Sequence, residues 1–260
     1  MAGKSAAISA ALFFFSALLF SSCLSSGSTG AGSSAIAGNF LITAPRPSAL
    51  TIIGVSGPLQ KREDEIAAAR EDAARKAAMY HGIRASYEIT HTTGSGIFGY
   101  KSESTLNLEY DDELEQYRER LSFDPDRDVA TNNRTVFIRF TYPAAFPGSI
   151  GYGFARNDDG RPSWTVNPPV QINGFAAGAG FASRQWRRQD TFVKSYEAAI
   201  AEIVSRLSAN VSTRDTSDGN WNNTSTITIQ GIVNLSNFLV LEIWIDPKTQ
   251  VVWTLVIAGT

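Results

Sequence analysis

The feature that most constrains the fold of this 260-residue chain is a pair of apolar segments near its C-terminus, residues 237–246 and 250–258. Each has the length and composition of a strand, and residues 246–249 between them (Asp-Pro-Lys-Thr) predict a type I turn. One face would carry Leu239, Leu241, Ile243 and Ile245, the other Phe238, Val240 and Trp244, with Val251, Trp253, Leu255 and Ile257 beside them. A strand that is apolar on both faces has to be covered on both. The cover would be another part of the chain, a neighbouring subunit or lipid.

Two long segments have the three- and four-residue spacing of apolar side chains that predicts amphipathic helices. The stripe in residues 60–82 consists mainly of alanine, so we expect this helix to lie close against a sheet: Ile66, Ala69, Ala73, Ala77 and Tyr80. The stripe in residues 186–208 is larger: Trp186, Val193, Tyr196, Ile200, Ile203 and Leu207. Neither helix would be stable without packing on another element.

Both predicted helices occupy the same place in a repeated order of strand, long helix and about three further strands. The strands are predicted at residues 49–56, 83–90, 103–110 and 133–142, and again at 174–182, 211–216, 224–233 and in the C-terminal hairpin. We therefore expect an α+β fold of two repeated modules, each one long helix packed on a small antiparallel sheet. The modules would span residues 39–145 and 146–260, divided by a segment rich in Pro and Gly. The alternative is two unrelated α+β segments that share this order.

The N-terminal residues 1–22 have the layout of a secretory signal peptide. Lys4 supplies the early positive charge, Ile8 to Phe20 form an apolar block, and Ser21 and Ser22 are small residues at its exit. The block is shorter than the roughly 18–20 residues that a membrane-spanning helix needs. We therefore expect it to be removed rather than to act as an anchor.

Cys23, the one cysteine of the chain, directly follows this exit. The run Phe20-Ser21-Ser22-Cys23 resembles the bacterial lipobox, in which a peptidase cuts before a cysteine that carries a diacylglycerol, although the lipobox usually has Leu where this chain has Phe20. The resemblance implies cleavage between Ser22 and Cys23 and lipidation of Cys23, which would explain a thiol with no disulfide partner. Acyl chains at about 0.8 kcal/mol per buried CH₂ would anchor the chain stably. The alternative is an ordinary secretory signal that happens to contain a cysteine.

Residues 23–38 are almost entirely Ser, Gly, Ala and Thr, a composition that predicts a flexible tether. Such a coil spans on the order of 20 Å, enough to hold a folded body off a membrane. After loss of Lys4 the chain has 22 Lys and Arg against 25 Asp and Glu, a formal charge of −3. This balance argues against a nucleic-acid partner, which would require a basic surface.

Residues 161–169 (RPSWTVNPP), the strand GFAAGAGFA and the following helix together resemble the LPP-twenty-type bacterial lipoprotein family. The likeness covers residues 162–258, and residues 49–142 resemble a divergent second copy. The family includes flagellar P-type lipoproteins, which build rings around the flagellar motor at the outer membrane. The resemblance implies an envelope-anchored, non-enzymatic building block and carries over no catalytic residue.

The ionisable residues do not predict an enzyme. His81 and His91 are the two histidines, and neither stands in a metal-binding spacing. No nucleophile elbow and no phosphate-binding loop is present, so we assign no catalytic residue, no metal ligand and no cofactor. The candidate interaction residues are aromatic, and they would line a groove for sugar or peptide or else belong to the core: Trp164, Phe175, Phe181, Trp186, Trp244 and Trp253.

These observations predict a lipid-anchored cell-envelope protein with a structural or scaffolding role, facing the periplasm from the outer membrane. It would assemble with copies of itself or bind other envelope proteins, with the flagellar motor as one candidate location. The first alternative is a module that binds cell-wall fragments or lipids through the aromatic residues. A hydrolase without a recognisable motif is less favoured.

Overall fold

The computed structural model describes residues 40–43, 48–94, 101–148, 150, 154–208, 210–217 and 223–260. The predicted signal peptide, Cys23 and the tether lie outside these residues. In chain order the elements are β1 (Leu50–Ser56), α1 (Arg62–His81), β2 (Ile83–Gly94), β3 (Lys101–Glu109), α2 (Glu115–Arg118), β4 (Val129–Asn132), β5 (Thr135–Tyr142), the 3₁₀ turn η1 (Ser163–Thr165), β6 (Gln171–Ile172), β7 (Phe175–Ala182), α3 (Arg188–Ser208), β8 (Asn210–Ser217), β9 (Asn223–Ile245) and β10 (Val252–Gly259).

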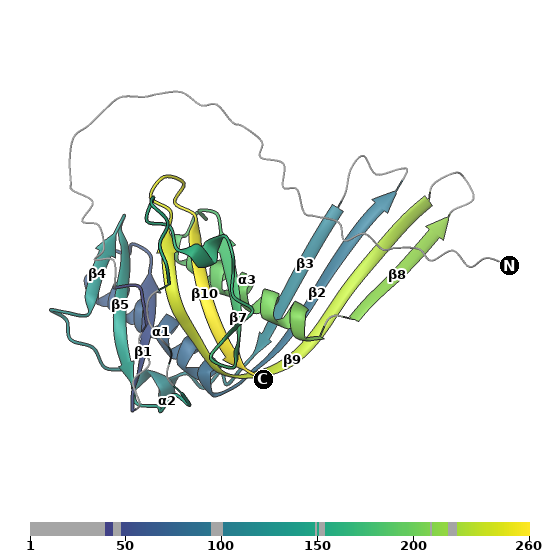
Figure 1. Ribbon diagram of the computed structural model, residues 1–260. Coiled ribbons are helices and arrows are strands. Elements are labelled where there is room, and N and C mark those ends of the chain that lie inside the picture. Colours follow the sequence, from purple (N-terminus) through teal and green to yellow (C-terminus); the bar gives the residue numbers. More distant parts are fainter. Residues whose placement is uncertain are drawn as a thin grey trace, which may run out of the picture. The chain divides into compact units, whose positions relative to one another are not determined.

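The strands form two antiparallel sheets (Figure 1). The smaller sheet has the order β1-β5-β4, and the larger has the order β3-β2-β9-β10-β7-β6, with β8 also pairing with β9. All the described residues belong to one compact unit.

The 23-residue strand β9 joins the two halves of the sequence into one sheet. Its first part pairs with β2 and β8, from Thr224 opposite Gly94 to Leu235 opposite Ile83, and its second part pairs with β10. Strands β2 and β3, from the first half of the chain, thus extend a sheet built by the second half. The α+β class is fair, but the prediction of two repeated helix-on-sheet modules is wrong. Periodicity identifies the buried face of a strand and leaves its neighbour undetermined.

The prediction that the alanine-rich helix lies close to a sheet is confirmed. Ala69, Ala73 and Ala77 of α1 have no exposed surface. The approach to β1 is so close that a Cβ on Gly54 would lie 2.0 Å from the carbonyl oxygen of Ala69. Helix α3 lies equally close to β7, where a Cβ on Gly180 would meet the α3 backbone at 2.2 Å. Small residues therefore set the distance from helix to sheet in both places.

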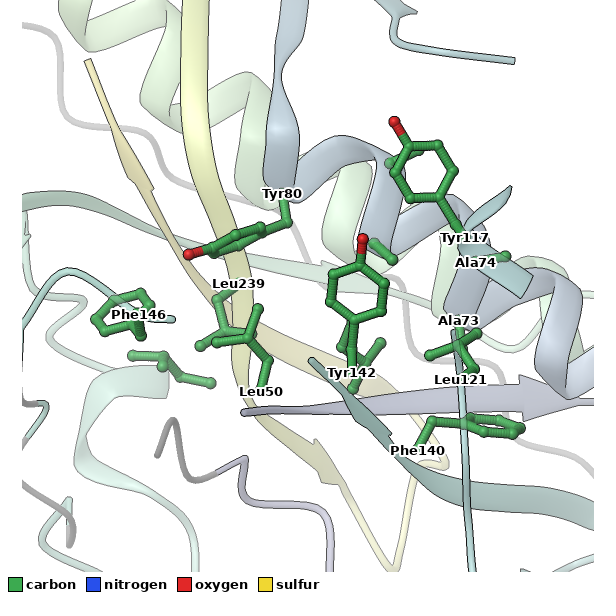
Figure 2. Close-up of a cluster of buried hydrophobic side chains, with 14 of the residues drawn as sticks. Leu50, Ala73, Ala74, Tyr80, Tyr117, Leu121, Phe140, Tyr142, Phe146 and Leu239 are labelled. Atoms are coloured by element: carbon green, nitrogen blue, oxygen red, sulfur yellow. The ribbon is translucent and has the colours of Figure 1, made fainter. Parts of the chain in front are cut away.

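The C-terminal hairpin is covered on both faces, as its composition requires, and the cover comes from the chain itself. On one face Val240 and Val256 belong to a core formed with α3. On the other face Leu239 and Leu255 belong to a core formed with α1, β1 and β5. Figure 2 shows Leu239 of β9 among side chains of those elements.

The assignment of β9 side chains to faces is corrected by a bulge. Leu255 of β10 pairs with Glu242, but the next residue, Val256, pairs with Val240, so the register shifts by one residue. Each shift of one moves side chains to the opposite face. Ile243 therefore lies in the same core as Val240, away from Leu239.

An ion pair in the core connects α1 to β1. The Lys76 ammonium donates to the Asp72 carboxylate at 2.6 Å and to the Ile53 carbonyl at 2.7 Å, and the Val55 backbone N–H donates to Asp72 at 2.9 Å. Both side chains are almost completely buried. The pair satisfies its own hydrogen-bonding groups and fixes the position of α1 along β1.

Candidate interaction site

Four strands, in the order β3-β2-β9-β8, form a continuous antiparallel ladder that we call the arm. It consists of β2, β3, β8 and the first part of β9, residues 223–235. Residues at one level can be followed across all four strands: Glu103 pairs with Thr90, Thr90 with Thr228, and Thr228 with Ser212. In Figure 1 these strands lie side by side.

The arm has one apolar face and one polar face, because directly paired residues point to the same side of a sheet. The apolar face carries Tyr87, Ile89, Leu106, Leu108, Val211, Ile227, Ile229 and Val233, with Ser104 and Thr213 farther out on the same face. The polar face carries Glu88, Glu103, Thr105, Asn107, Ser212, Arg214 and Gln230, and one exposed apolar residue, Ile232. Such alternation is typical of a sheet that covers a core with one face.

The rest of the described chain covers only the part of the apolar face that lies next to α3. Tyr87, Leu106 and Leu108 pack against the core around α3. Farther out, Val211 is 65% exposed and Ile227 is 39% exposed. Exposed apolar side chains that continue a core outward along a sheet make this face a candidate interaction surface.

A groove of about 580 Å³ lies where the apolar face meets the two long helices. It is lined by apolar side chains, including Leu106 and Val193, and by Arg75, Tyr196 and Glu197. Burial raises the pKa of Glu197, and burial together with the nearby Asp72 carboxylate raises the pKa of Tyr196 well above its usual value. Burial alone would lower the pKa of Arg75, but the neighbouring Tyr196 and Asp72 outweigh it and the net shift is upward.

The two edges of the arm are open within the described part of the chain. There β3 pairs only with β2, and β8 pairs only with β9. Each edge strand leaves a row of backbone N–H and C=O groups without a partner strand, which is a ready template for pairing with another chain. The edges differ in charge on the polar face: Glu103 and Glu109 lie on β3, where Glu109 pairs with Arg84 of β2 at 3.6 Å, and Arg214 lies on β8.

The six aromatic candidates do not form one cluster. Phe181 of β7 stacks on Trp253 of β10 at a ring distance of 4.8 Å, and Trp253 pairs directly with Trp244 of β9. The Arg161 guanidinium lies 5.2 Å from the Trp253 ring and 5.9 Å from the Trp244 ring. These three rings form an aromatic row across three strands, partly covered by the arginine.

The other three aromatic candidates lie apart from this row. Trp164 is buried, and its indole N–H donates to the Glu242 carboxylate at 2.8 Å, while Arg156 pairs with the other oxygen of Glu242. Phe175 packs against Phe146. Trp186 is fully exposed, because α3 begins only at Arg188. Trp164 thus has the core role that was one of its two interpretations.

Of the two histidines, His81 lies against a tyrosine. His81 Nε2 lies 2.8 Å from the Tyr142 hydroxyl, and burial together with Arg120 lowers the pKa of His81. Among the residues that the structure describes, no group of three His, Cys, Asp or Glu side chains is placed to hold a metal ion. Nor does any helix in that part of the chain have the length and apolar character to cross a membrane.

The arm is the structural feature that sequence reasoning missed. Its strands were predicted singly, and nothing in their alternation indicated that residues 83–94 pair with residues 224–235. Comparison with protein-family models, with curated proteins and with solved structures finds no match. The interpretation of this chain therefore depends on its own residues, and the resemblance to LPP-twenty-type lipoproteins stays a prediction.

Proposed function

We propose that this chain is a lipid-anchored structural protein of the bacterial cell envelope that assembles with copies of itself. The observation that carries the assembly is the arm, an amphipathic antiparallel sheet with two open edges. Natural proteins usually cover or shorten such edges when they act as monomers. Strands of eight and nine residues at both edges are therefore best explained by a partner.

The anchor is proposed from Cys23 and its surroundings. A lone thiol directly after a signal-like segment, followed by a Ser- and Gly-rich tether, supports lipidation at this residue. The protein then faces the periplasm from the outer membrane, and many copies held in one leaflet meet at a high local concentration. Anchoring and assembly in this way support each other. The flagellar motor is one location for such an assembly.

Membrane fractionation and mass spectrometry test the anchor. In cells that make the full chain, we expect the outer-membrane fraction to contain a protein that begins at Cys23 and carries acyl chains. Cys23→Ala should lose the acyl mass and the outer-membrane location. A processed chain whose first residue carries no acyl chain would refute the anchor.

Analytical ultracentrifugation of the detergent-solubilised full chain tests the assembly. We expect a species of several copies whose mass does not change when the detergent is exchanged. A monomer at every concentration up to the micromolar range would refute self-assembly.

The aromatic row supports a second candidate, binding of cell-wall sugars. Flat rings at neighbouring positions of three strands offer a stacking surface, and Phe181 at its end is 53% exposed. This function would be indicated if the full chain were retained on peptidoglycan and Phe181→Ala abolished the retention. Trp186→Ala is the matched control, because it removes an exposed ring outside the row.

A further inference from the structure

We propose that neighbouring copies join head to tail, with β3 of one copy pairing with β8 of the next. This inference rests on the proposed function, because it names the surface through which self-assembly occurs. It starts from the two edges of the arm, which belong to different strands and differ in charge.

Strand direction makes these two edges compatible. Each neighbouring pair in the order β3-β2-β9-β8 is antiparallel, so β3 and β8 run in opposite directions. A second copy in the same orientation therefore presents β8 antiparallel to β3, and the ladder continues from copy to copy. Every copy then uses one β3 edge and one β8 edge, which is the geometry of a heterologous interface.

Charge favours this pairing over a symmetric pairing of two β3 edges centred on Leu106. In that register Glu103 of one copy would lie opposite Glu109 of the other, and Glu109 opposite Glu103. Like charges across a strand pair are destabilising, whereas opposite charges contribute favourably. Pairing β3 with β8 instead sets Glu103 beside Arg214.

One register satisfies both faces of the arm. The offset has to be even in order to keep polar and apolar faces aligned. When Glu103 lies opposite Arg214 of the next copy, Thr105 lies opposite Ser212 on the polar face and Leu106 lies opposite Val211 on the apolar face. Within one copy, the pairing across the four strands puts Glu103 in line with Ser212. The register between copies is displaced from that alignment by two residues.

The same register covers the most exposed apolar side chain of the apolar face. Val211 is 65% exposed in the single chain, and Leu106 of the next copy would pack directly against it. In the register without this displacement, Glu103 of one copy lies opposite Ser212 of the next, and Ser104 instead lies opposite Val211. The apolar face would then lose this contact, and the assigned register is therefore preferred.

Disulfide trapping between copies tests the interface. Thr105→Cys and Ser212→Cys in one full-length chain place two thiols at directly opposed positions, where the expected Cα separation of about 4.5–5.5 Å suits a disulfide. Both side chains are exposed on edge strands, and circular dichroism checks that the variant folds. Under mild oxidation we expect a ladder of dimers, trimers and larger species on a non-reducing gel.

Three controls make the result specific. In a chain whose Cys23 carries its lipid, as mass spectrometry would check, each single variant should give no ladder, because a head-to-tail link needs both introduced thiols. Thr105→Cys with Asn210→Cys, which tests the register without the displacement, should link less efficiently. Thr90→Cys with Ser212→Cys should not link, because Thr90 lies on the inner strand β2 with β3 and β9 on either side.

The outcomes separate this inference from the proposed function. If the chain sediments as several copies but the Thr105–Ser212 variant gives no ladder, the interface is wrong and self-assembly stands. Dimers from single variants alone would show symmetric pairing and overturn the inference, and a dominant Thr105–Asn210 link would overturn the register. A chain that stays monomeric, or that binds phosphatidylglycerol vesicles only as a monomer, overturns both.

Discussion

Gly180→Ala should destabilise the chain strongly, because the glycine allows β7 to approach the backbone of α3. A Cβ at this position would lie 2.2 Å from the backbone nitrogen of Ala199 and 2.2 Å from the carbonyl oxygen of Ser195. Neither atom belongs to a side chain that could rotate away. Ordinary contact begins near 3.4 Å, so α3 would have to move away from β7 by roughly 1 Å.

The size of the effect follows from what that movement disturbs. Phe192, Tyr196 and Ile203 of α3 are almost completely buried, and all three would lose contact with the core. Overpacking of a core costs about 1–3 kcal/mol, and we expect about 3 kcal/mol or more where only backbone atoms can yield. In a domain of this size, 1 kcal/mol changes Tm by about 2–4 °C. The Tm should therefore fall by about 6–12 °C.

Urea unfolding of the full chain, followed by circular dichroism, measures the change in the free energy of unfolding. Gly82→Ala is the matched control: nothing lies within 4 Å of a Cβ there, and its φ of 169° is extended backbone that any residue adopts. The control should stay within about 0.5 kcal/mol of the wild type. If Gly180→Ala unfolded at the same urea concentration as Gly82→Ala, glycine would not set the spacing between α3 and the sheet.

Three further variants test polar groups. Lys76→Met leaves the buried Asp72 carboxylate without its cation, so urea unfolding should show a loss of about 3–5 kcal/mol; an unchanged midpoint would contradict this. Burial raises the pKa of Glu197, so the folded chain holds this proton more tightly than the unfolded chain, and stability falls as pH rises above the ordinary carboxyl pKa. The Tm of Glu197→Gln should therefore be higher than that of the wild type at pH 7, and the difference in Tm should shrink towards pH 4. Identical Tm values at pH 7 would refute this reasoning. Trp164→Phe removes the indole donor to Glu242 and should cost about 1–3 kcal/mol in the same urea assay, and a neutral result would remove its structural role.

Much of the local structure was predictable, because burial leaves a periodic signature. The alanine stripe of α1 predicted close packing, and Ala69, Ala73 and Ala77 are indeed completely buried. The two apolar faces of the C-terminal hairpin required cover on both sides. The sequence did not decide whether another part of the chain, a neighbouring subunit or lipid would cover these faces. Composition measures how apolar a face is and does not identify what lies on it.

The arrangement of strands was less predictable, for two physical reasons. The first is that β9 is one continuous strand in the structure, whereas the sequence predicts two strands with a break between them. Asn237, which adopts a left-handed conformation with φ 51°, lies within β9 near this predicted break. The second is that a strand pairs through its backbone, which every residue type supplies alike. The sequence of β2 therefore shows an amphipathic strand and contains no sign of β9 as its neighbour.

The arm and the rest of the described chain, here called the body, differ in burial, and they therefore differ in how much they depend on a partner. In the body, β10 has Val252, Val256 and Ile257 with no exposed surface, so helices of the same chain supply nearly all of its cover. In the arm, β8 has exposed side chains at each described position from 210 to 214. Its order rests on a single ladder with β9, and a two-stranded contact alone is only marginally stable in water. Strand β8 has the least support from its own chain, so it would be stabilised most by pairing with a neighbouring copy. Hydrogen exchange at the β8 amides should accordingly slow on assembly far more than exchange at β10.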